Sequence, residues 1–326
     1  MMQRRTFSTA GLLLAGALVT GLVGCVADES VAEDPLNQGE TSAPTRPPPV
    51  GRRVGIVLAH GLGGGPDSFD PSIVAALQAD GFYVLRDSVP PVDSVATRAT
   101  ALAAQVSAFI ASNRLDTVHI IAHSMGGLDS RYLLAKLGAP KVKSLTTLST
   151  PHRGSPLADL GLGIKRSLTV SQQDAILALT EFLGTDVTSE QLDRALGDLA
   201  EAHAAAFNAA TPDVPGVAYY SYSGLSTLFG VGNPNAGQAC AAPGVTTPAP
   251  SSLPGLLRLA GPIVAGGLAL RPHDGVVPVD SARWTGFLGC IPTDHLDMTR
   301  AGAKPMEELE IELVPFFRQI VARVTR

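Results

Sequence analysis

The sequence predicts an α/β domain with a mainly parallel central sheet flanked by helices. Apolar runs of strand length alternate with stretches of helical spacing, and this alternation is typical of βαβ units. The chain has 326 residues, of which 45% are hydrophobic and only 16% are charged. A chain of that length and composition can bury a sizeable core, so a disordered or fibrous protein is excluded.

Four short apolar runs are expected to form strands of the sheet. They lie at Val54–Ala59, Val118–Ala122, Lys143–Ser149 and Val217–Ser223. Apolar residues recur with helical spacing from Val95 to Phe109, and a second helix is expected from about Leu128 to Leu137. Each of these two helices follows or precedes a strand, as a parallel sheet requires.

The strand pattern stops between about Ser155 and Pro215. Helical spacing takes its place, most clearly over Ser189–Ala209. We interpret residues 155–215 as a helical cap, or lid, inserted over the sheet. A plain additional helical layer fits the same pattern.

The first 24 residues have the layout of an export signal. Arg4 and Arg5 precede an apolar stretch from Ala10 to Gly24, which is shorter than the ~20 residues that span a membrane. Leu22-Val23-Gly24-Cys25 resembles the lipobox of bacterial lipoproteins, in which the cysteine becomes a lipid-carrying N-terminus. The alternative is an ordinary signal peptide with Cys25 incidental.

Residues 25–50 are expected to form a flexible tether, because prolines and polar residues dominate them and cannot bury enough apolar surface to fold. The folded domain is then 51–326. The predicted protein is exported and held on the cell envelope by its lipid, at the outer membrane if the source is Gram-negative, or else secreted. The formal net charge of −5 and the lack of a basic cluster argue against a nucleic-acid partner.

Ser124 lies in the stretch Ile121-Ala-His-Ser-Met-Gly-Gly-Leu128, between a predicted strand and a predicted helix. A nucleophilic serine at such a sharp turn needs small residues two positions before and after it, and here these are Ala122 and Gly126. The stretch therefore predicts a nucleophile elbow, against the alternative of an ordinary turn serine.

A serine nucleophile needs a base, and the base needs an orienting acid, in the chain order serine, acid, histidine. His295 lies near the C-terminus where that base is expected, whereas His203 falls in a helical stretch and is expected at the surface. Asp274, in a loop before an apolar run, is the predicted acid. Its competitors are Asp280, Asp294 and Asp297.

The oxyanion that forms on an attacked carbonyl needs two preorganised N–H donors. The elbow supplies the N–H of Met125, and the glycine-rich loop His60-Gly-Leu-Gly-Gly-Gly65 is expected to supply that of Leu62. His60 is expected to hold this loop rather than to react. Because the loop lacks a closing Lys-Ser/Thr, it does not fit a phosphate-binding loop.

Six stretches occur here in the order found in a known family. They are VLAHGLGG (57–64), AHSMGGLDSRYL (122–133), STPHRGSPLAD (149–159), GVAYYSYSG (216–224), HDGVVPVDSARW (273–284) and DHLDM (294–298). Over roughly residues 54–298 the chain resembles the bacterial true lipases of the α/β-hydrolase fold, the Pseudomonas and Burkholderia type of triacylglycerol lipase.

The resemblance implies a serine hydrolase that cleaves carboxylic esters, acylglycerols above all, with a mobile lid drawn from 155–215. It assigns Ser124 as nucleophile, Asp274 as acid, His295 as base, and Leu62 and Met125 as oxyanion donors. Lipid or ester substrates are the implied partners, with a folding chaperone as a further one. The alternatives are a short-chain carboxylesterase, a phospholipase, a polyester depolymerase, or a surface lipoprotein that binds without catalysis.

The sequence departs from that family at two points. The family binds calcium through the aspartate of its HLD motif, here Asp297, together with a second aspartate upstream of the catalytic acid, but the matching stretch Ser251–Gly255 has no carboxylate. We therefore expect no cofactor, with calcium at Asp297 as the weaker alternative. If Cys25 carries lipid, Cys240 and Cys290 remain to form a disulfide or stay as buried thiols. Cys290 lies closer to the histidine than the family's cysteine does.

Overall fold

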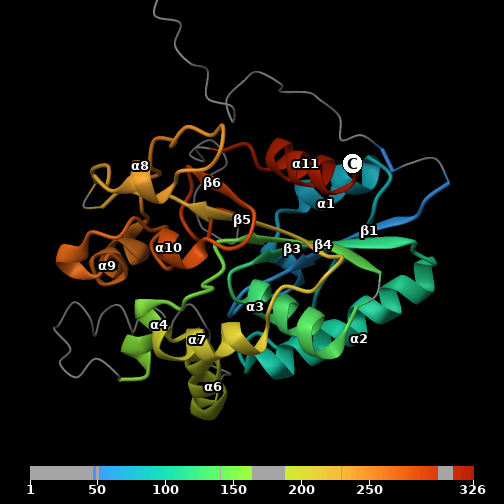
Figure 1. Cartoon of the computed structure of the whole chain (residues 1–326), viewed down its shortest axis with the longest axis horizontal. Coiled ribbons are helices and arrows are strands. Elements are labelled where there is room, and N and C mark those ends of the chain that lie inside the picture. The colour runs from blue at the N-terminus through green and yellow to red at the C-terminus, as the bar shows by residue number, and fades with distance from the viewer. Residues whose placement is uncertain (1–46, 49–50, 140, 164–187, 229, 300–310) are drawn as a thin grey trace, which may run out of the picture. The chain divides into compact units, whose positions relative to one another are not determined.

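The computed structural model describes residues 47–48, 51–139, 141–163, 188–228, 230–299 and 311–326 (Figure 1). The predicted export signal and Cys25 lie outside the described residues. No helix among those described is long and apolar enough to cross a membrane.

A parallel six-stranded sheet forms the centre, in the order β2-β1-β3-β4-β5-β6. Its strands are β1 (Val54–Ala59), β2 (Tyr83–Arg86), β3 (Thr117–His123), β4 (Val142–Leu148), β5 (Ala218–Gly224) and β6 (Phe287–Ile291). The four strands expected from the sequence are present with ends shifted by at most one residue. The mainly parallel α/β architecture is confirmed.

The two outermost strands, β2 and β6, were not expected. β2 has only four residues, Tyr83–Arg86, a run too short to show a clear period. β6 contains Gly289 at a φ of 108°, and glycine inside a strand lowers the strand signal. Both edges are thus set by pairing with β1 and β5 rather than by local sequence.

Helices cover the two faces of the sheet. On one face, α1 (Pro71–Ala79) and α11 (Leu313–Val324) pack through Ile73, Phe317 and Ile320 against Ile56 and Leu58. On the other face lie α2 (Val95–Asn113), α3 (Met125–Tyr132) and the π-helical turn η2 (Leu133–Leu137) that continues α3. α2 and η2 share a second apolar core with β1, β3 and β4. Figure 1 shows the α1 and α11 layer on the opposite side of the sheet from α2 and α3.

The helix after Ser124 begins at Met125, three residues before the expected start. It continues through Leu137, but its last turn is π-helical. The expected Val95–Phe109 helix is present and extends to Asn113.

Further helices follow the carboxyl ends of the strands. They are η1 (Pro66–Ser68), α4 (Pro156–Gly161), α6 (Ser189–Leu199), α7 (Glu201–Ala210), α8 (Ala236–Ala239), α9 (Gly255–Val264), η3 (Gly267–Ala269) and α10 (Val279–Ala282). α4 contacts α6, α7 and α9. The contact between α4 and α9 joins segments that are more than 90 residues apart in the chain.

The helical stretch expected at Ser189–Ala209 is two helices, α6 and α7, with a break at Ala200. The carbonyl of Leu199 accepts a hydrogen bond from the N–H of Ser155, 2.9 Å away, and is therefore lost to the helix. Residues 164–187 of the predicted cap lie outside the described residues.

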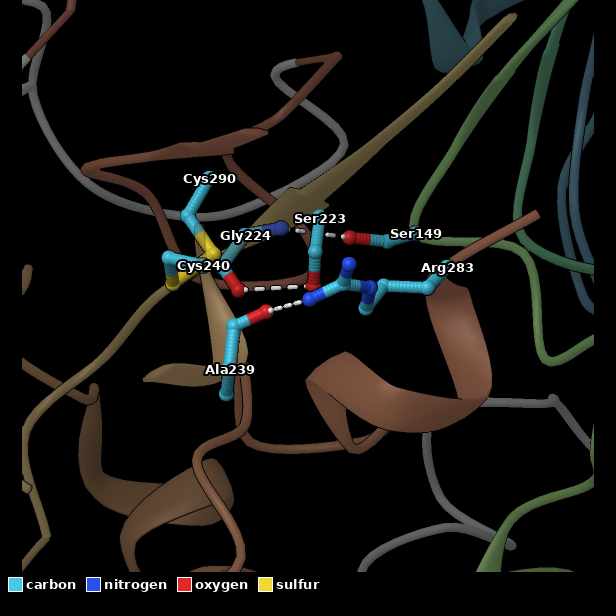
Figure 2. Close-up of a disulfide and its surroundings, with 7 residues drawn as sticks. All are labelled: Ser149, Ser223, Gly224, Ala239, Cys240, Arg283 and Cys290. Carbon is cyan, nitrogen blue, oxygen red and sulfur yellow. Dashed lines mark hydrogen bonds between the residues drawn. A yellow bond between two sulfur atoms is a disulfide. The ribbon is translucent and has the colours of Figure 1, made fainter. Parts of the chain in front are cut away.

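A disulfide joins Cys240, directly after α8, to Cys290 in β6, closing a sequence separation of 50 residues (Figure 2). Its Cα atoms are 5.2 Å apart, and both cysteines are buried. The bridge therefore ties the segment before α9 to the strand that leads to His295.

Candidate active site

Ser124 lies at the turn between β3 and α3 with φ 53° and ψ −130°, a backbone conformation that L-residues rarely adopt. Such strain costs on the order of 1–3 kcal/mol and persists where the surrounding structure enforces it. Here the N–H of Ser124 donates to the carbonyl of Leu148 at 2.9 Å. A Cβ at Gly126 would lie 2.6 Å from the carbonyl oxygen of His60, so only glycine fits two residues after the serine.

His295 links the serine to an aspartate. Its Nε2 lies 2.9 Å from Ser124 Oγ, and its Nδ1 lies 2.8 Å from Asp274 Oδ2. Because a carboxylate only accepts, Nδ1 carries the proton and donates to Asp274. Nε2 then has a free lone pair, to which the Ser124 hydroxyl donates. This is the geometry of a nucleophile, a base and an orienting acid.

Asp274 is fully buried, and burial by itself raises the pKa of its carboxyl. The charge and hydrogen bond of His295, the N–H of Val277 and the hydroxyl of Ser149 outweigh that effect, so the pKa lies below its usual value. Oδ1 accepts from the N–H groups of Val276 and Val277, at 3.0 and 2.7 Å. The carboxylate is therefore ionised at neutral pH.

The glycine-rich loop after β1 lies directly against the elbow. A Cβ at Gly61 would lie 2.7 Å from Ser124 Cβ, so the loop can come this close only with glycine there. Leu62 is half-buried and lines the pocket above the serine. Met125 is buried and is the first residue of α3, so its N–H has no partner within the helix. The two residues expected to supply oxyanion donors therefore flank Ser124.

Arg98 of α2 joins the glycine-rich loop to the elbow helix. Its Nε donates to Asp129 of α3 at 2.8 Å, and its Nη2 donates to the carbonyl of His60 at 2.9 Å. Nη1 donates to the carbonyl of Pro91 at 3.1 Å. This guanidinium is fully buried, so it holds three segments around the site in one arrangement.

The pocket above Ser124 is mostly apolar. Its walls come from four segments that are distant in the chain: α4, α6, α9 and the loop after Asp274. They contribute Leu157, Ala158, Leu196, Leu199, Leu257, Ala260, Val276 and Val277. Its polar lining residues include Ser124 and His295. The pocket thus suits an apolar chain attached to a reactive polar group.

α9 forms one of those walls and has a proline in its interior. The helix ends at Val264, and Gly261 and Pro262 lie within it. The carbonyl that proline leaves without an N–H partner is that of Arg258, an exposed residue, so water can satisfy it.

The competing aspartates do not contact His295 in the way that Asp274 does. Asp280 is exposed and pairs with Arg271 at 2.9 Å. Asp294 accepts from the N–H groups of Leu296 and Asp297 and so shapes the turn that carries His295. His203 is exposed, as expected.

His60 holds its own loop through two contacts. Its Nδ1 donates to the Gly61 carbonyl at 2.8 Å, and its N–H donates to Asp87 at 2.9 Å. Burial and the nearby Arg98 charge lower its pKa to about 4, so the ring is neutral at neutral pH.

The described residues offer no cluster of carboxylates for calcium at Asp297. Asp297 is buried, but no group of three or more His, Cys, Asp or Glu side chains that could hold a metal occurs among the described residues. Calcium takes six to eight oxygen ligands, and carboxylates supply most of its protein charge. The loop around Asp297 therefore carries no step of the chemistry below.

The sequence argument missed His123, which precedes the nucleophile. Its Nε2 donates to the carbonyl of His295 at 2.8 Å, and its ring lies 4.7 Å from the His295 ring. Burial, followed by the nearby His295 charge, lowers its pKa to about 3, so it stays neutral. The place of His123 inside the elbow motif could have indicated a role at the site. Its partner His295, however, is 172 residues away in the chain.

Comparisons with known proteins agree with this geometry. A family described as alpha/beta hydrolase fold matches residues 55–190. Triacylglycerol lipase 2 of Saccharomyces cerevisiae is 30% identical over 231 residues, covering 68% of this chain and 59% of that protein. A triacylglycerol lipase of Vibrio cholerae is 33% identical over 208 residues, covering 56% of this chain and 66% of that protein. The chain thus spans less than two thirds of the length of these relatives.

Among solved structures, the mature form of Bacillus licheniformis lipase BlEst2 is similar with a TM-score of 0.56 and 21% identity, covering 89% of this chain and 96% of that one. At this identity the likeness concerns the fold alone. The parallel sheet, the strained serine between β3 and α3, and these matches together show that the chain is a protein of the α/β-hydrolase fold.

Proposed function

We propose that the protein hydrolyses carboxylic esters, acylglycerols above all, through an acyl-enzyme on Ser124. One observation carries the proposal: a hydrogen-bonded chain from Asp274 through His295 to Ser124 opens into an apolar pocket. The similarity to triacylglycerol lipases supports the same class of substrate.

In the first half of the cycle, His295 Nε2 takes the hydroxyl proton as Ser124 Oγ attacks the ester carbonyl. Asp274 holds the ring by its Nδ1–H and stabilises the imidazolium that forms. The N–H groups of Leu62 and Met125 receive the oxyanion, a role in which a single donor is worth ~10²–10³ in rate. His295 then passes its proton to the leaving alcohol.

In the second half, His295 removes a proton from water, and the hydroxide attacks the acyl-enzyme carbonyl. The same two N–H groups stabilise the second oxyanion, and Ser124 regains its proton as the acid leaves. This cycle uses groups of the protein alone.

The acyl chain is assigned to the apolar walls formed by α4, α6 and α9. Leu157, Leu196 and Leu257 face the pocket from these three helices. Burying one methylene from water contributes about 0.8 kcal/mol, so binding should strengthen with each carbon until the pocket is filled.

The test compares wild-type protein with Ser124→Ala on nitrophenyl esters of increasing acyl length and on a triolein emulsion. Ser124→Ala should lower kcat by at least about 10⁴-fold. Ser112→Ala, at an exposed serine of α2, is the matched control and should match wild type. Equal hydrolysis by Ser124→Ala and wild type would overturn the mechanism.

The same series separates the substrate classes. A lipase cleaves long-chain esters and triolein, whereas a short-chain carboxylesterase loses activity as the acyl chain lengthens. Phospholipid vesicles and a polyester film test the phospholipase and depolymerase alternatives. A surface protein that only binds would fail to react with a fluorophosphonate probe at Ser124.

We further propose that residues 155–215 form a cap, or lid, over the site. α6 supplies Leu196 and Leu199 to the pocket wall, and its Arg194 pairs with Asp93 beside α2 at 3.0 Å. Asp198 also accepts from the N–H of Val95 at 2.7 Å. If the cap opens, amide exchange over residues 189–199 should quicken on addition of detergent micelles. Unchanged exchange would contradict a moving cap.

Export and anchoring are proposed from the sequence. Residues 1–24 are a cleaved signal, Cys25 carries the lipid, residues 25–50 are the tether, and the hydrolase domain is 51–326 on the cell envelope. Cys25→Ser should move the protein from the membrane to the soluble fraction, and unchanged membrane binding would contradict the anchor. Refolding of the denatured domain without helpers tests the need for a chaperone.

A further inference from the structure

Ser149 directly follows β4 and has a backbone conformation that disfavours any side chain. Its φ is 49°, and it is one of four described residues other than glycine with positive φ, along with Arg114, Ser124 and Leu270. It is fully buried. Glycine would adopt this conformation with less strain, so the serine side chain calls for an explanation.

The Ser149 hydroxyl lies between two groups of the site. It accepts a hydrogen bond from the N–H of Gly224 at 2.9 Å, as Figure 2 shows. Its own proton is then available to a second acceptor, and the Asp274 carboxylate lies close enough for this hydroxyl to help lower the carboxyl pKa. Gly224 itself lies against the acid, because a Cβ placed on it would come within 2.8 Å of Asp274 Cβ.

The same strand end also supports the nucleophile. The carbonyl of Leu148, the residue before Ser149, accepts a hydrogen bond from the N–H of Ser124. The N–H of Ser149 donates to the backbone carbonyl of Tyr222 in β5 at 2.9 Å. The other N–H donors to Asp274 come from its own loop, at Val276 and Val277. Ser149 therefore links the acid to the part of the sheet that holds the serine.

We propose that Ser149 is a positioning residue for Asp274: its hydroxyl fixes the carboxylate to the end of β4 and so sets the aim of His295 at Ser124. This inference rests on the proposed ester-hydrolase function. The hydroxyl acts only through Asp274 and does not contact the reacting atoms. A stable arrangement of the acid lowers the barrier of both halves of the cycle, so its loss should appear in kcat more than in KM.

Two substitutions separate the hydroxyl from the strained backbone. Ser149→Ala removes the hydroxyl and keeps the strain, whereas Ser149→Gly removes the hydroxyl and relieves the strain. The matched control is Ser223→Ala, which removes a buried hydroxyl that donates to the carbonyl of the same Gly224 at 3.0 Å (Figure 2). Ser223 has no contact with Asp274 among the interactions of the described residues.

We expect both Ser149 variants to lower kcat on a nitrophenyl ester about tenfold with KM nearly unchanged, as for loss of one hydrogen bond to a charged group. Ser223→Ala should keep wild-type kcat. Loss of the donor also raises the pKa of Asp274, so the acid-side fall of kcat/KM should move to higher pH in both Ser149 variants. The other titratable groups around this carboxylate, His123, His273 and His295, are unchanged in all variants.

Two results would overturn the inference. If Ser149→Gly is as active as wild type, with an unshifted pH profile, the hydroxyl has no role. If Ser223→Ala loses as much activity as Ser149→Ala, the effect is general loosening of the strand ends. Failure of the proposed function is a separate result, because wild type itself would then neither hydrolyse the ester nor react with the fluorophosphonate.

A measurement on the unsubstituted protein covers the case in which the variants do not fold. Neutron diffraction locates the exchanged deuteron of the Ser149 hydroxyl. Density for it on the line from Ser149 Oγ to the Asp274 carboxylate supports the inference, and density pointing elsewhere contradicts it.

Discussion

At the scale of single residues, the site is built from backbone conformations that cost stability. Ser124 at φ 53° and Ser149 at φ 49° lie at adjacent strand ends, β3 and β4, beside each other in the sheet. Ser124 belongs to the triad, and Ser149 helps lower the pKa of Asp274. Strain of this kind is kept at sites where orientation matters more than stability.

Ser124 offers a direct test of that strain. Ser124→Gly relieves the backbone and Ser124→Ala keeps it, while both remove the nucleophile. Glycine also costs stability, because it loses more conformational freedom on folding than alanine does. After that cost is subtracted, we expect Ser124→Gly to be more stable than Ser124→Ala, with a free energy of unfolding about 1 kcal/mol higher. Urea unfolding of the two variants measures the difference, and a less stable glycine variant would contradict it.

At the scale of elements, the catalytic groups are held by contacts between segments that are not neighbours in the chain. The glycine-rich loop follows β1, the elbow lies between β3 and α3, and the acid lies between η3 and α10. Arg98 on α2 connects the first two of these through Asp129 and the carbonyl of His60. The relative position of the oxyanion donors thus depends on one buried side chain.

Arg98→Lys tests this connection. Lysine keeps the charge but has a single donor head, which cannot reach Asp129, His60 and Pro91 together. We expect kcat to fall at least about tenfold, because the loop and the elbow lose their fixed spacing. The matched control is Arg318→Lys, which alters a two-bond pair with Asp80 between α11 and the end of α1, on the opposite face of the sheet. A loss of kcat of the same size in the control would mean that lost stability explains both.

At the scale of the whole molecule, the disulfide closes a 50-residue separation that contains Asp274. On the chain-entropy account, a loop of this length contributes about 4 kcal/mol by restricting the unfolded chain. The paired change of Cys240→Ala and Cys290→Ala should lower the free energy of unfolding by about that amount. Dithiothreitol should lower the urea midpoint of wild type and leave that of the double variant unchanged. A wild-type midpoint insensitive to reduction would contradict the contribution.

Buried titratable groups should make stability depend on pH. Burial lowers the pKa of His119 to about 4, so between pH 6.5 and 4 the unfolded chain binds a proton that the folded protein excludes. Stability from this group is therefore full above pH 6.5 and falls as the pH decreases, by about 3 kcal/mol at pH 4. Asp87 and Asp129 have the opposite sign, because burial raises the pKa of each to about 7.

A substitution isolates the histidine from those carboxylates. When the pH falls from 7 to 4, the free energy of unfolding of wild type should drop by about 3 kcal/mol more than that of His119→Gln. His203→Gln, the same substitution at an exposed histidine, is the matched control. A difference for His119→Gln that stays constant with pH would contradict the prediction.

The sequence by itself determined the features that depend on neighbouring residues. The four inner strands, the turn at Ser124 and the small residues around it follow from apolar periodicity and from the space at a tight turn. The sequence also indicated the chain order of serine, aspartate and histidine. It favoured Asp274 as the acid over Asp280, Asp294 and Asp297, but local sequence does not give the distance from a carboxylate to the histidine ring.

The tertiary structure alone decided which groups meet. It placed Asp274 at 2.8 Å from His295, paired Asp280 with Arg271 instead, and brought Ser149, Arg98 and His123 to the site from other elements. It also set the edge strands β2 and β6, which are only four and five residues long. The physical reason is common to all of these: each contact joins residues far apart in the chain, and its distance is fixed by how sheet and helices pack.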